Sequence, residues 1–311
     1  LGKPIKREEL AAALMRPLDV ERTVATADPQ TVKTVLVAED NAVNREVLIS
    51  MLSKLGYAVE VAENGAAAVF AVQNRRFSAI FMDLHMPVQD GFQAVRRIRA
   101  LEADAARNSG LPPRRVPVIA ATADALKGDR DRCLEAGFDD YLAKPFGMDH
   151  LKRILARWTG YDPELAQAAP ANEPELPESA DDVPLVDPRQ VRAIADFGGE
   201  RGHEVAARVV QIFLTNTPRQ IDELKDALER ADWAGVAQAG HAVKGAAANV
   251  GAYRLMIAAR EIEHIARTGE RDQGTDTIRT LNRIYGATDH ELRSLLRTLE
   301  DEDRQARVAT G

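Results

Sequence analysis

The chain has 311 residues, of which 45% are apolar, with 20 glycines and 15 prolines; this is enough for about two ordinary domains and excludes a disordered protein. A single cysteine, Cys133, excludes an internal disulfide and a multi-cysteine zinc motif, as expected for a reducing, cytoplasmic setting. No apolar run approaches the roughly 20 residues that span a bilayer, and no basic stripe marks a nucleic-acid-binding surface in a chain of net charge −7.

The first residues of the chain resemble a later segment of it. Residues 1–5 (LGKPI) match residues 142–146 (LAKPF), and a pair of leucines follows each of them at the same spacing. We therefore expect residues 1–18 to be the last helix of a preceding, truncated copy of the domain that begins at Lys33, with a linker at residues 19–32. Chance similarity over a short stretch is the alternative.

Between residues 33 and 159, short β-branched or apolar runs alternate with segments of helical period. The runs cover residues 35–38, 59–61, 79–82, 118–121 and 141–143. Five such repeats predict a doubly wound α/β domain, in which helices wrap a five-stranded parallel sheet. Ligands of such sheets bind at the carboxyl ends of the strands, so the polar residues that follow the runs are the candidates for a site.

Five polar side chains follow these runs and should converge at one edge of the sheet: Glu39, Asp40, Asp83, Thr122 and Lys144. Three carboxylates at one edge repel one another unless a cation lies among them or one of them is protonated. Mg²⁺ prefers oxygen ligands and accepts phosphate oxygens, so Asp40 and Asp83 suit it as direct ligands and Glu39 through water. The lysine and the threonine hydroxyl can hold phosphoryl oxygens, which predicts a phosphoryl-transfer site.

These residues lie in motifs that closely resemble the receiver domain of two-component response regulators. The motifs are residues 39–45 (EDNAVNR), 82–91 (MDLHMPVQDG), 121–123 (ATA) and 144–145 (KP). The resemblance covers residues 33–158 and implies a flavodoxin-like fold with strand order 2-1-3-4-5. The flanking residues are similar in particular to the receivers attached to hybrid histidine kinases.

The resemblance also implies a role for each acidic residue of the site. Asp83 is the aspartate that becomes phosphorylated. Asp40 and Asp83 bind Mg²⁺ together with the backbone carbonyl of His85, and Glu39 completes the acidic pocket. The imidazole of His85 is expected to be loop surface without a chemical role.

The remaining roles fall on residues near the last two strands. By the same resemblance, Thr122 and Lys144 contact the phosphoryl group, and Tyr141 is the aromatic residue that changes rotamer on activation; Tyr141 is also consistent with an ordinary half-buried strand residue. Asn41 and Asn44 are expected only to cap or begin a helix.

Residues 160–184 separate two domains. They include seven acids and five prolines but no Lys or Arg, which accounts for the whole net charge. Such a segment cannot bury a core, so we expect a semi-extended, solvated linker. About 25 residues span roughly 25–30 Å, which allows the two flanking domains to meet at an effective concentration of about 1 mM.

After this linker the sequence shows only helical patterns. Residues 185–305 predict an antiparallel four-helix bundle, followed by a short tail at residues 306–311. The expected helices carry apolar residues at 205–213 and, after Pro218, at 221–228; further helices run over about 233–250, 253–268 and about 275–299.

The helix around His241 can be projected at 100° per residue. With Val236 at zero, the apolar stripe stays within about 40°, whereas His241 falls near 140° and Lys244 near 80°. We therefore expect an exposed imidazole flanked by one cation and by the small residues Gly245 and Ala248. Glycine costs a helix interior roughly 0.5–1 kcal/mol relative to alanine, so Gly245 favours close approach of a partner.

An exposed imidazole near its usual pKa can attack a phosphoryl group, and Lys244 one turn away would neutralise the phosphate. Residues 241–245 (HAVKG) resemble the HxxKG signature of histidine-containing phosphotransfer (HPt) domains, over about residues 185–305. The resemblance implies that His241 is phosphorylated and that Gly245 and Ala248 form the docking surface. Ala247 departs from the family, which often has serine there.

Together these features predict a phosphorelay segment. Asp83 accepts a phosphoryl group from the phosphohistidine of a histidine kinase core, and His241 carries it to or from a receiver aspartate of a downstream response regulator. No ATP-binding signature is found in the chain, so whether it is itself an enzyme stays open. We expect the kinase domain elsewhere in a parent hybrid histidine kinase, which can be anchored in the inner membrane.

Two alternatives belong to other functional classes. A Mg²⁺-dependent phosphatase with an aspartate nucleophile resembles DxDx[TV], but His85 stands at the position of the second acid. A docking-only pseudo-receiver predicts the loss of an acidic or lysine position, and none is lost.

Overall fold

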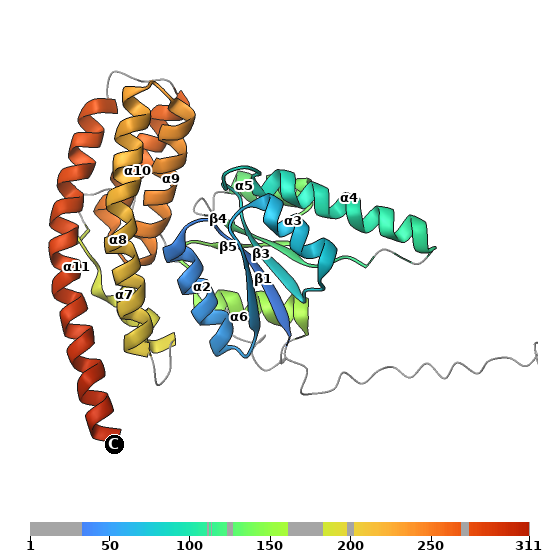
Figure 1. Ribbon diagram of the computed structural model, residues 1–311, viewed down its shortest axis with the longest axis horizontal. Coiled ribbons are helices and arrows are strands. Elements are labelled where there is room, and N and C mark those ends of the chain that lie inside the picture. Colours follow the sequence, from blue (N-terminus) through green and yellow to red (C-terminus); the bar gives the residue numbers. More distant parts are fainter. Residues whose placement is uncertain are drawn as a thin grey trace, which may run out of the picture. The chain divides into compact units, whose positions relative to one another are not determined.

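The computed structural model describes residues 33–110, 112, 114–122, 127–160, 183–197, 202–268 and 274–310 (Figure 1). The predicted helix at residues 1–18, the linker at 19–32 and nearly all of the linker at 160–184 lie outside these residues.

The N-terminal domain is built on a five-stranded sheet, as predicted. The strands are β1 (Thr34–Ala38), β2 (Ala58–Ala62), β3 (Ala79–Asp83), β4 (Val118–Thr122) and β5 (Asp140–Ala143). All pairs are parallel and the order is β2-β1-β3-β4-β5, which confirms the predicted topology. Each predicted run agrees with its strand to within one residue at either end. Parallel pairing brings the carboxyl ends of β1, β3, β4 and β5 to the same edge.

Helices cover both faces of this sheet. They are α2 (Ala42–Lys54), α3 (Gly65–Asn74), α4 (Gly91–Ser109), α5 (Lys127–Ala136) and α6 (Met148–Thr159). Alternate residues of β1 point to opposite faces: Val35 and Val37 join the apolar core formed with α2 and α6, and Leu36 and Ala38 join the core formed with α3 and α4. The inner strands β1, β3 and β4 are buried on both faces, which explains their continuous apolar runs, whereas the edge strand β2 is partly exposed.

The C-terminal domain is helical. Its helices are α7 (Pro188–Phe197), α8 (Gly202–Glu229), α9 (Trp233–Asn249), α10 (Tyr253–Thr268) and α11 (Gly274–Thr310). The four long helices pack around one core, in which α9 contacts both α8 and α10, and α11 contacts both α8 and α10. This arrangement confirms the predicted bundle.

Two helices are longer than the sequence patterns indicate. The structure runs α8 without interruption through Pro218, because the buried stripe stays in phase on both sides of it, at Phe213, Thr217 and Ile221. Packing of a continuous apolar face thus outweighs the hydrogen bond that proline cannot make. Helix α11 extends past residue 299, the predicted end.

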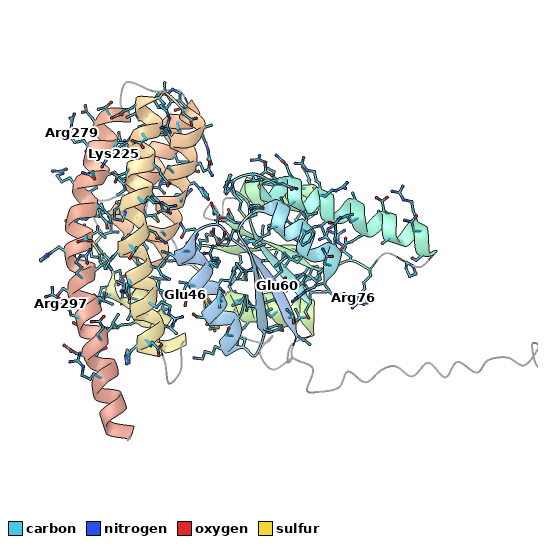
Figure 2. All side chains as sticks on the ribbon, viewed as in Figure 1. Glu46, Glu60, Arg76, Lys225, Arg279 and Arg297 are labelled. Carbon is cyan, nitrogen blue, oxygen red and sulfur yellow. The ribbon has the colours of Figure 1, made fainter. Side chains whose placement is uncertain are left out.

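Charged side chains occupy the outward faces of the helices, as Figure 2 shows for Lys225, Arg279 and Arg297. None of the described helices combines the length and the apolar character needed to cross a bilayer.

Candidate functional site

The strand ends place three carboxylates and one ammonium group together. Single oxygens of Glu39, Asp40 and Asp83 lie within 4.8 Å of one another. The Nζ atom of Lys144 lies 2.8 Å from Glu39 Oε2 and 2.8 Å from Asp83 Oδ2, and each of these three side chains is at most 3% exposed. The structure therefore brings together the four charged residues that the strand ends predict.

This acidic cluster carries a net negative charge that its single lysine does not balance. Burial and the charge of Asp83 raise the pKa of Glu39 to about 8, and the same two causes raise the pKa of Asp40. Burial alone would also raise the pKa of Asp83, but the charge of Lys144 and its hydrogen bond hold that pKa below its ordinary value. Three carboxylate oxygens with an excess of negative charge suit a hard divalent cation such as Mg²⁺.

Other predicted residues surround this cluster. Thr122 ends β4 and is buried, and its carbonyl accepts a hydrogen bond from the backbone N–H of Lys144 at 2.7 Å. Tyr141 is half-buried, and its ring packs edge-on against His150 at 5.8 Å between centroids. Gly91 begins α4 so close to Asp83 that a Cβ atom there would lie 2.3 Å from the Asp83 carbonyl oxygen, so a glycine is needed beside the acidic cluster.

His241 lies on α9, and the prediction that its imidazole is exposed was wrong. The residue is 8% exposed, because the N-terminal domain covers the face of α9 that carries it. The projection treats the helix as part of an isolated bundle and so cannot show a second domain packed against its outer face. The imidazole of His85 is likewise more than loop surface: its ring lies 4.4 Å from that of His241, although His85 remains exposed overall.

Helix α10 fixes the orientation of the His241 ring. Its Nδ1 atom lies 3.0 Å from Glu263 Oε1, and because a carboxylate only accepts, Nδ1 carries the proton. The Nε2 atom is buried and has no hydrogen-bond partner among the described residues. The sequence predicts Lys244 as a cation that flanks an exposed imidazole. In the structure Lys244 is buried, and its Nζ lies 2.7 Å from Glu263 Oε2.

The two predicted phosphorylation sites face each other. One ligand atom each of Asp83, His85 and His241 lie within 4.8 Å of one another. Close by, the Nδ2 atom of Asn41, which caps α2, donates to the carbonyl oxygen of Ala242 on α9 at 2.9 Å. A carboxylate oxygen of Asp83 and a ring nitrogen of His241 thus share one buried site.

Small residues of α9 allow this close approach. A Cβ atom built on Gly245 would lie 3.1 Å from Asn44 Nδ2 of α2, and Ala248 is buried. Gly245 and Ala248 are the two residues predicted for docking. The partner that approaches Gly245 is the side chain of Asn44 on α2.

Three site residues escaped the sequence analysis. Glu263 had no role there, although an acid between the buried Ala259 and Ile262 and the half-buried Ala266 interrupts an apolar helix face and could have marked it. Asn44 was expected only to begin a helix, yet it donates to Glu39 Oε1 at 3.0 Å. Asn249 had no detectable signal, because its partners come from the other domain.

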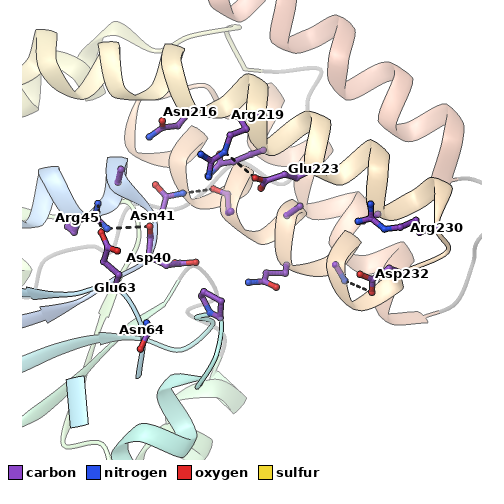
Figure 3. A pocket seen from close by; sticks show the side chains of 18 residues that line it. Asp40, Asn41, Arg45, Glu63, Asn64, Asn216, Arg219, Glu223, Arg230 and Asp232 are labelled. Atoms are coloured by element: carbon purple, nitrogen blue, oxygen red, sulfur yellow. Dashed lines mark hydrogen bonds and ion pairs between the residues drawn. The ribbon is translucent and has the colours of Figure 1, made fainter. Parts of the chain in front are cut away.

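A cleft of about 690 Å³ adjoins the site (Figure 3). Asp40 and Arg45 line it from one domain, and Arg219, Glu223 and Arg230 line it from α8 and the end of the bundle. Within it, Arg219 Nε lies 3.1 Å from Glu223 Oε1. The acidic cluster is therefore bordered by an open cleft at Asp40, while His241 covers the side of Asp83.

A receiver-like acidic site and a helical bundle with a central histidine define a phosphorelay signalling protein. The family model of the response regulator receiver domain matches residues 35–156, and that of the Hpt domain matches residues 208–305. Residues 35–156 are thus a receiver domain, and residues 208–305 are an Hpt domain that follows it.

Curated relatives of the chain are histidine kinases. The chain is 28% identical over 247 residues to the sensor histidine kinase GacS of Pseudomonas protegens, covering 79% of this chain and 25% of that protein. It is 43% identical over 122 residues to the peroxide stress-activated histidine kinase mak2 of Schizosaccharomyces pombe, covering 38% of this chain and 5% of mak2. The chain thus spans a quarter or less of these relatives.

Among solved structures, the chain is similar to the receiver domain of the sensor histidine kinase PA1611 of Pseudomonas aeruginosa, which has magnesium coordinated in its active-site cleft. The identity is 46%, with 42% of this chain and 99% of that chain covered and a TM-score of 0.36. A complex of the Saccharomyces cerevisiae phosphotransfer protein Ypd1 with the receiver domain of Ssk1 matches with 32% identity, 42% and 90% coverage and a TM-score of 0.39.

Glu263 predicts a pH dependence of stability. Burial alone would raise its pKa, but the hydrogen bond from His241 and the charges of His241 and Lys244 lower it from the ordinary 4.5 to about 2. A carboxyl whose folded-state pKa is lowered stabilises the fold above its unfolded pKa and loses that contribution as the pH falls. Urea unfolding should show wild type more stable than Glu263→Gln by about 1–3 kcal/mol at pH 6, with the gap closing between pH 4.5 and 2. A gap that is constant with pH contradicts this assignment.

Proposed function

We propose that Asp83 accepts a phosphoryl group from the phosphohistidine of a histidine kinase and passes it directly to His241 of the same chain. The observation that carries this proposal is the apposition of the two groups: a carboxylate oxygen of Asp83 and a ring nitrogen of His241 lie within 4.8 Å, in a site buried from water. The presence of a receiver domain and an Hpt domain in one chain also supports this transfer.

The arrangement fits an in-line transfer. The lone pair of Nε2 attacks phosphorus, the bond from phosphorus to the Asp83 oxygen breaks, and the carboxylate leaves with its electron pair. The imidazole becomes an imidazolium whose Nδ1 proton stays hydrogen-bonded to Glu263, so the new positive charge faces a carboxylate. On the other side, Lys144 at 2.8 Å stabilises the leaving Asp83 carboxylate. The same groups serve the reverse transfer.

The remaining roles extend the proposal. Thr122 and Lys144 hold phosphoryl oxygens, Tyr141 follows the phosphorylated state, and Lys244 supports the phosphate on His241. Asp40, Asp83 and the carbonyl of His85 would hold Mg²⁺, with Glu39 acting through water, and the bound ion would neutralise charge on the carboxylates and phosphoryl oxygens. The donor is the kinase core of a parent hybrid histidine kinase in the cytoplasm, and the final acceptor is a separate response regulator.

Neither alternative from the sequence is favoured by these findings. Every acidic and lysine position of a receiver site is present and clustered, unlike in a docking-only pseudo-receiver. A phosphatase of the DxDx[TV] type needs a second acid where the chain has His85, whose ring instead lies against His241.

Label should move from Asp83 to His241 in the wild-type chain. With acetyl phosphate and Mg²⁺, alkali-labile label on Asp83 should appear first and alkali-stable, acid-labile label on His241 should follow, both measured by peptide mass spectrometry. In His241→Gln, the aspartyl label should accumulate and no alkali-stable label should form. As a matched control, His290→Gln alters an exposed histidine of α11 and should behave as wild type. Alkali-stable label in His241→Gln would overturn the assignment of His241.

A further inference from the structure

A buried pair of amide side chains joins the two domains beside the phosphotransfer site. Asn44 on α2 is 2% exposed, and Asn249, the last residue of α9, is 1% exposed. Asn249 Nδ2 donates to Asn44 Oδ1 at 2.8 Å. The Oδ1 atom of Asn249 accepts from the backbone N–H of Phe146, on the loop after β5, at 3.4 Å. Asn249 therefore contacts two separate segments of the receiver with its two polar atoms.

The pair is linked to the phosphorylation site. Asn44 uses its Nδ2 atom to donate to Glu39 Oε1 at 3.0 Å, and the other carboxylate oxygen of Glu39 lies 2.8 Å from Lys144 Nζ, which also binds Asp83. The bond to Glu39 fixes the orientation of the Asn44 amide, and the carbonyl oxygen of Asn44 then accepts the hydrogen bond from Asn249. This fixes which amide orientation Asn249 must present.

Such a contact discriminates strongly between partners. A receiver with an apolar side chain in place of Asn44 would bury the Nδ2 atom of Asn249 without a partner, at a cost of about 1–3 kcal/mol, equivalent to roughly 5–150-fold in an equilibrium. Close packing leaves little room for the side chains to rearrange, because Gly245 of α9 lies against the same Asn44 side chain. A hydrogen bond that is lost on docking to the wrong partner is an effective specificity device.

We propose that Asn249 is a specificity-determining residue of the Hpt domain, which selects its own receiver by recognising the amide of Asn44. The proposal rests on the transfer from Asp83 to His241 and adds the rule by which the two domains choose each other. It predicts that Asn249 disfavours receivers with an apolar residue at the position of Asn44.

The test uses the burial of His241 as a measure of docking. Its Nε2 atom is inaccessible in the docked state, so diethyl pyrocarbonate should modify His241 at a rate proportional to the undocked fraction of the full chain. Peptide mass spectrometry gives this rate for wild type, Asn44→Leu, Asn249→Leu and the double variant. The corresponding alanine variants form a second cycle in case a leucine variant fails to fold. Asn282→Leu, on the exposed face of α11, is the matched control.

Each single variant should raise the modification rate of His241 about 10–100-fold, because one amide is left unpaired. The double variant should have a lower rate than the product of the two single effects, because neither half of the Asn249–Asn44 hydrogen bond is then buried without its partner. Single variants at the wild-type rate, or a double variant whose rate is the product of the two single effects, would overturn the proposal. This readout needs no phosphate, so it fails separately from the label transfer that tests the proposed function.

Discussion

Replacement of Asp83 by asparagine should abolish phosphorylation at both positions of the chain. Asparagine keeps the shape of the side chain and can still face Lys144, but it cannot form an acyl phosphate. Because His241 receives its phosphate from Asp83 in this account, label from acetyl phosphate should fall at least 100-fold on Asp83 and on His241 alike, measured at each residue by peptide mass spectrometry.

The exposed Asp149 of α6 offers a matched control, since Asp149→Asn removes the same charge away from the site. This variant should label as wild type does. Wild-type levels of phosphohistidine in Asp83→Asn would show that His241 takes its phosphate straight from the donor, without the receiver.

Replacement of Lys144 by methionine should affect both stability and transfer. Its ammonium group is the shared cation of Glu39 and Asp83, at 2.8 Å from each and with every side chain at most 3% exposed. Removal of one partner from a buried ion pair typically costs about 3–5 kcal/mol, and Glu39 can reduce this cost by taking up a proton. The leaving carboxylate of Asp83 would also lose its stabilising charge, so transfer should slow about 100–1000-fold.

Urea unfolding and the rate of label transfer measure these two effects separately. Lys152→Met removes a lysine of α6 from a loose 3.9 Å ion pair, and its stability should stay within about 0.5 kcal/mol of wild type. If Lys144→Met transfers phosphate at the wild-type rate, Lys144 plays no part in the chemistry.

The acidic cluster was predictable because parallel topology converts positions along the chain into positions in space. Once the apolar runs are recognised as parallel strands, Asp40, Asp83 and Lys144 must meet at one edge, although they are up to 104 positions apart, from 40 to 144. Their residue types then constrain the chemistry, and the structure places them as expected.

The environment of His241 was not predictable in the same way. A helical projection reports which face of α9 meets the core of its own bundle, and it says nothing about a second domain that covers the opposite face. The burial of His241 and the contact with His85 arise between domains, where no periodicity in the sequence records the pairing. The bond of Asn249 to Asn44 escaped prediction for the same reason.

Glu263 represents a different kind of omission. Its signal was present in the sequence, since a carboxylate on an otherwise apolar helix face must find a partner when it is buried. The structure supplies three: His241 Nδ1 at 3.0 Å and Lys244 Nζ at 2.7 Å, both from α9, and Arg267 one turn along α10. A buried acid on an apolar helix face is therefore worth pairing with the histidine of a neighbouring helix.

The concentration dependence of the transfer tests the central claim most directly. Wild-type chain labelled on Asp83 should be diluted over a 100-fold range, and the half-time for the appearance of phosphohistidine at His241 should be measured at each concentration. Transfer within one chain predicts the same half-time throughout. A half-time that lengthens in proportion to dilution would show that Asp83 and His241 exchange phosphate only between separate chains, which would contradict the docked site described here.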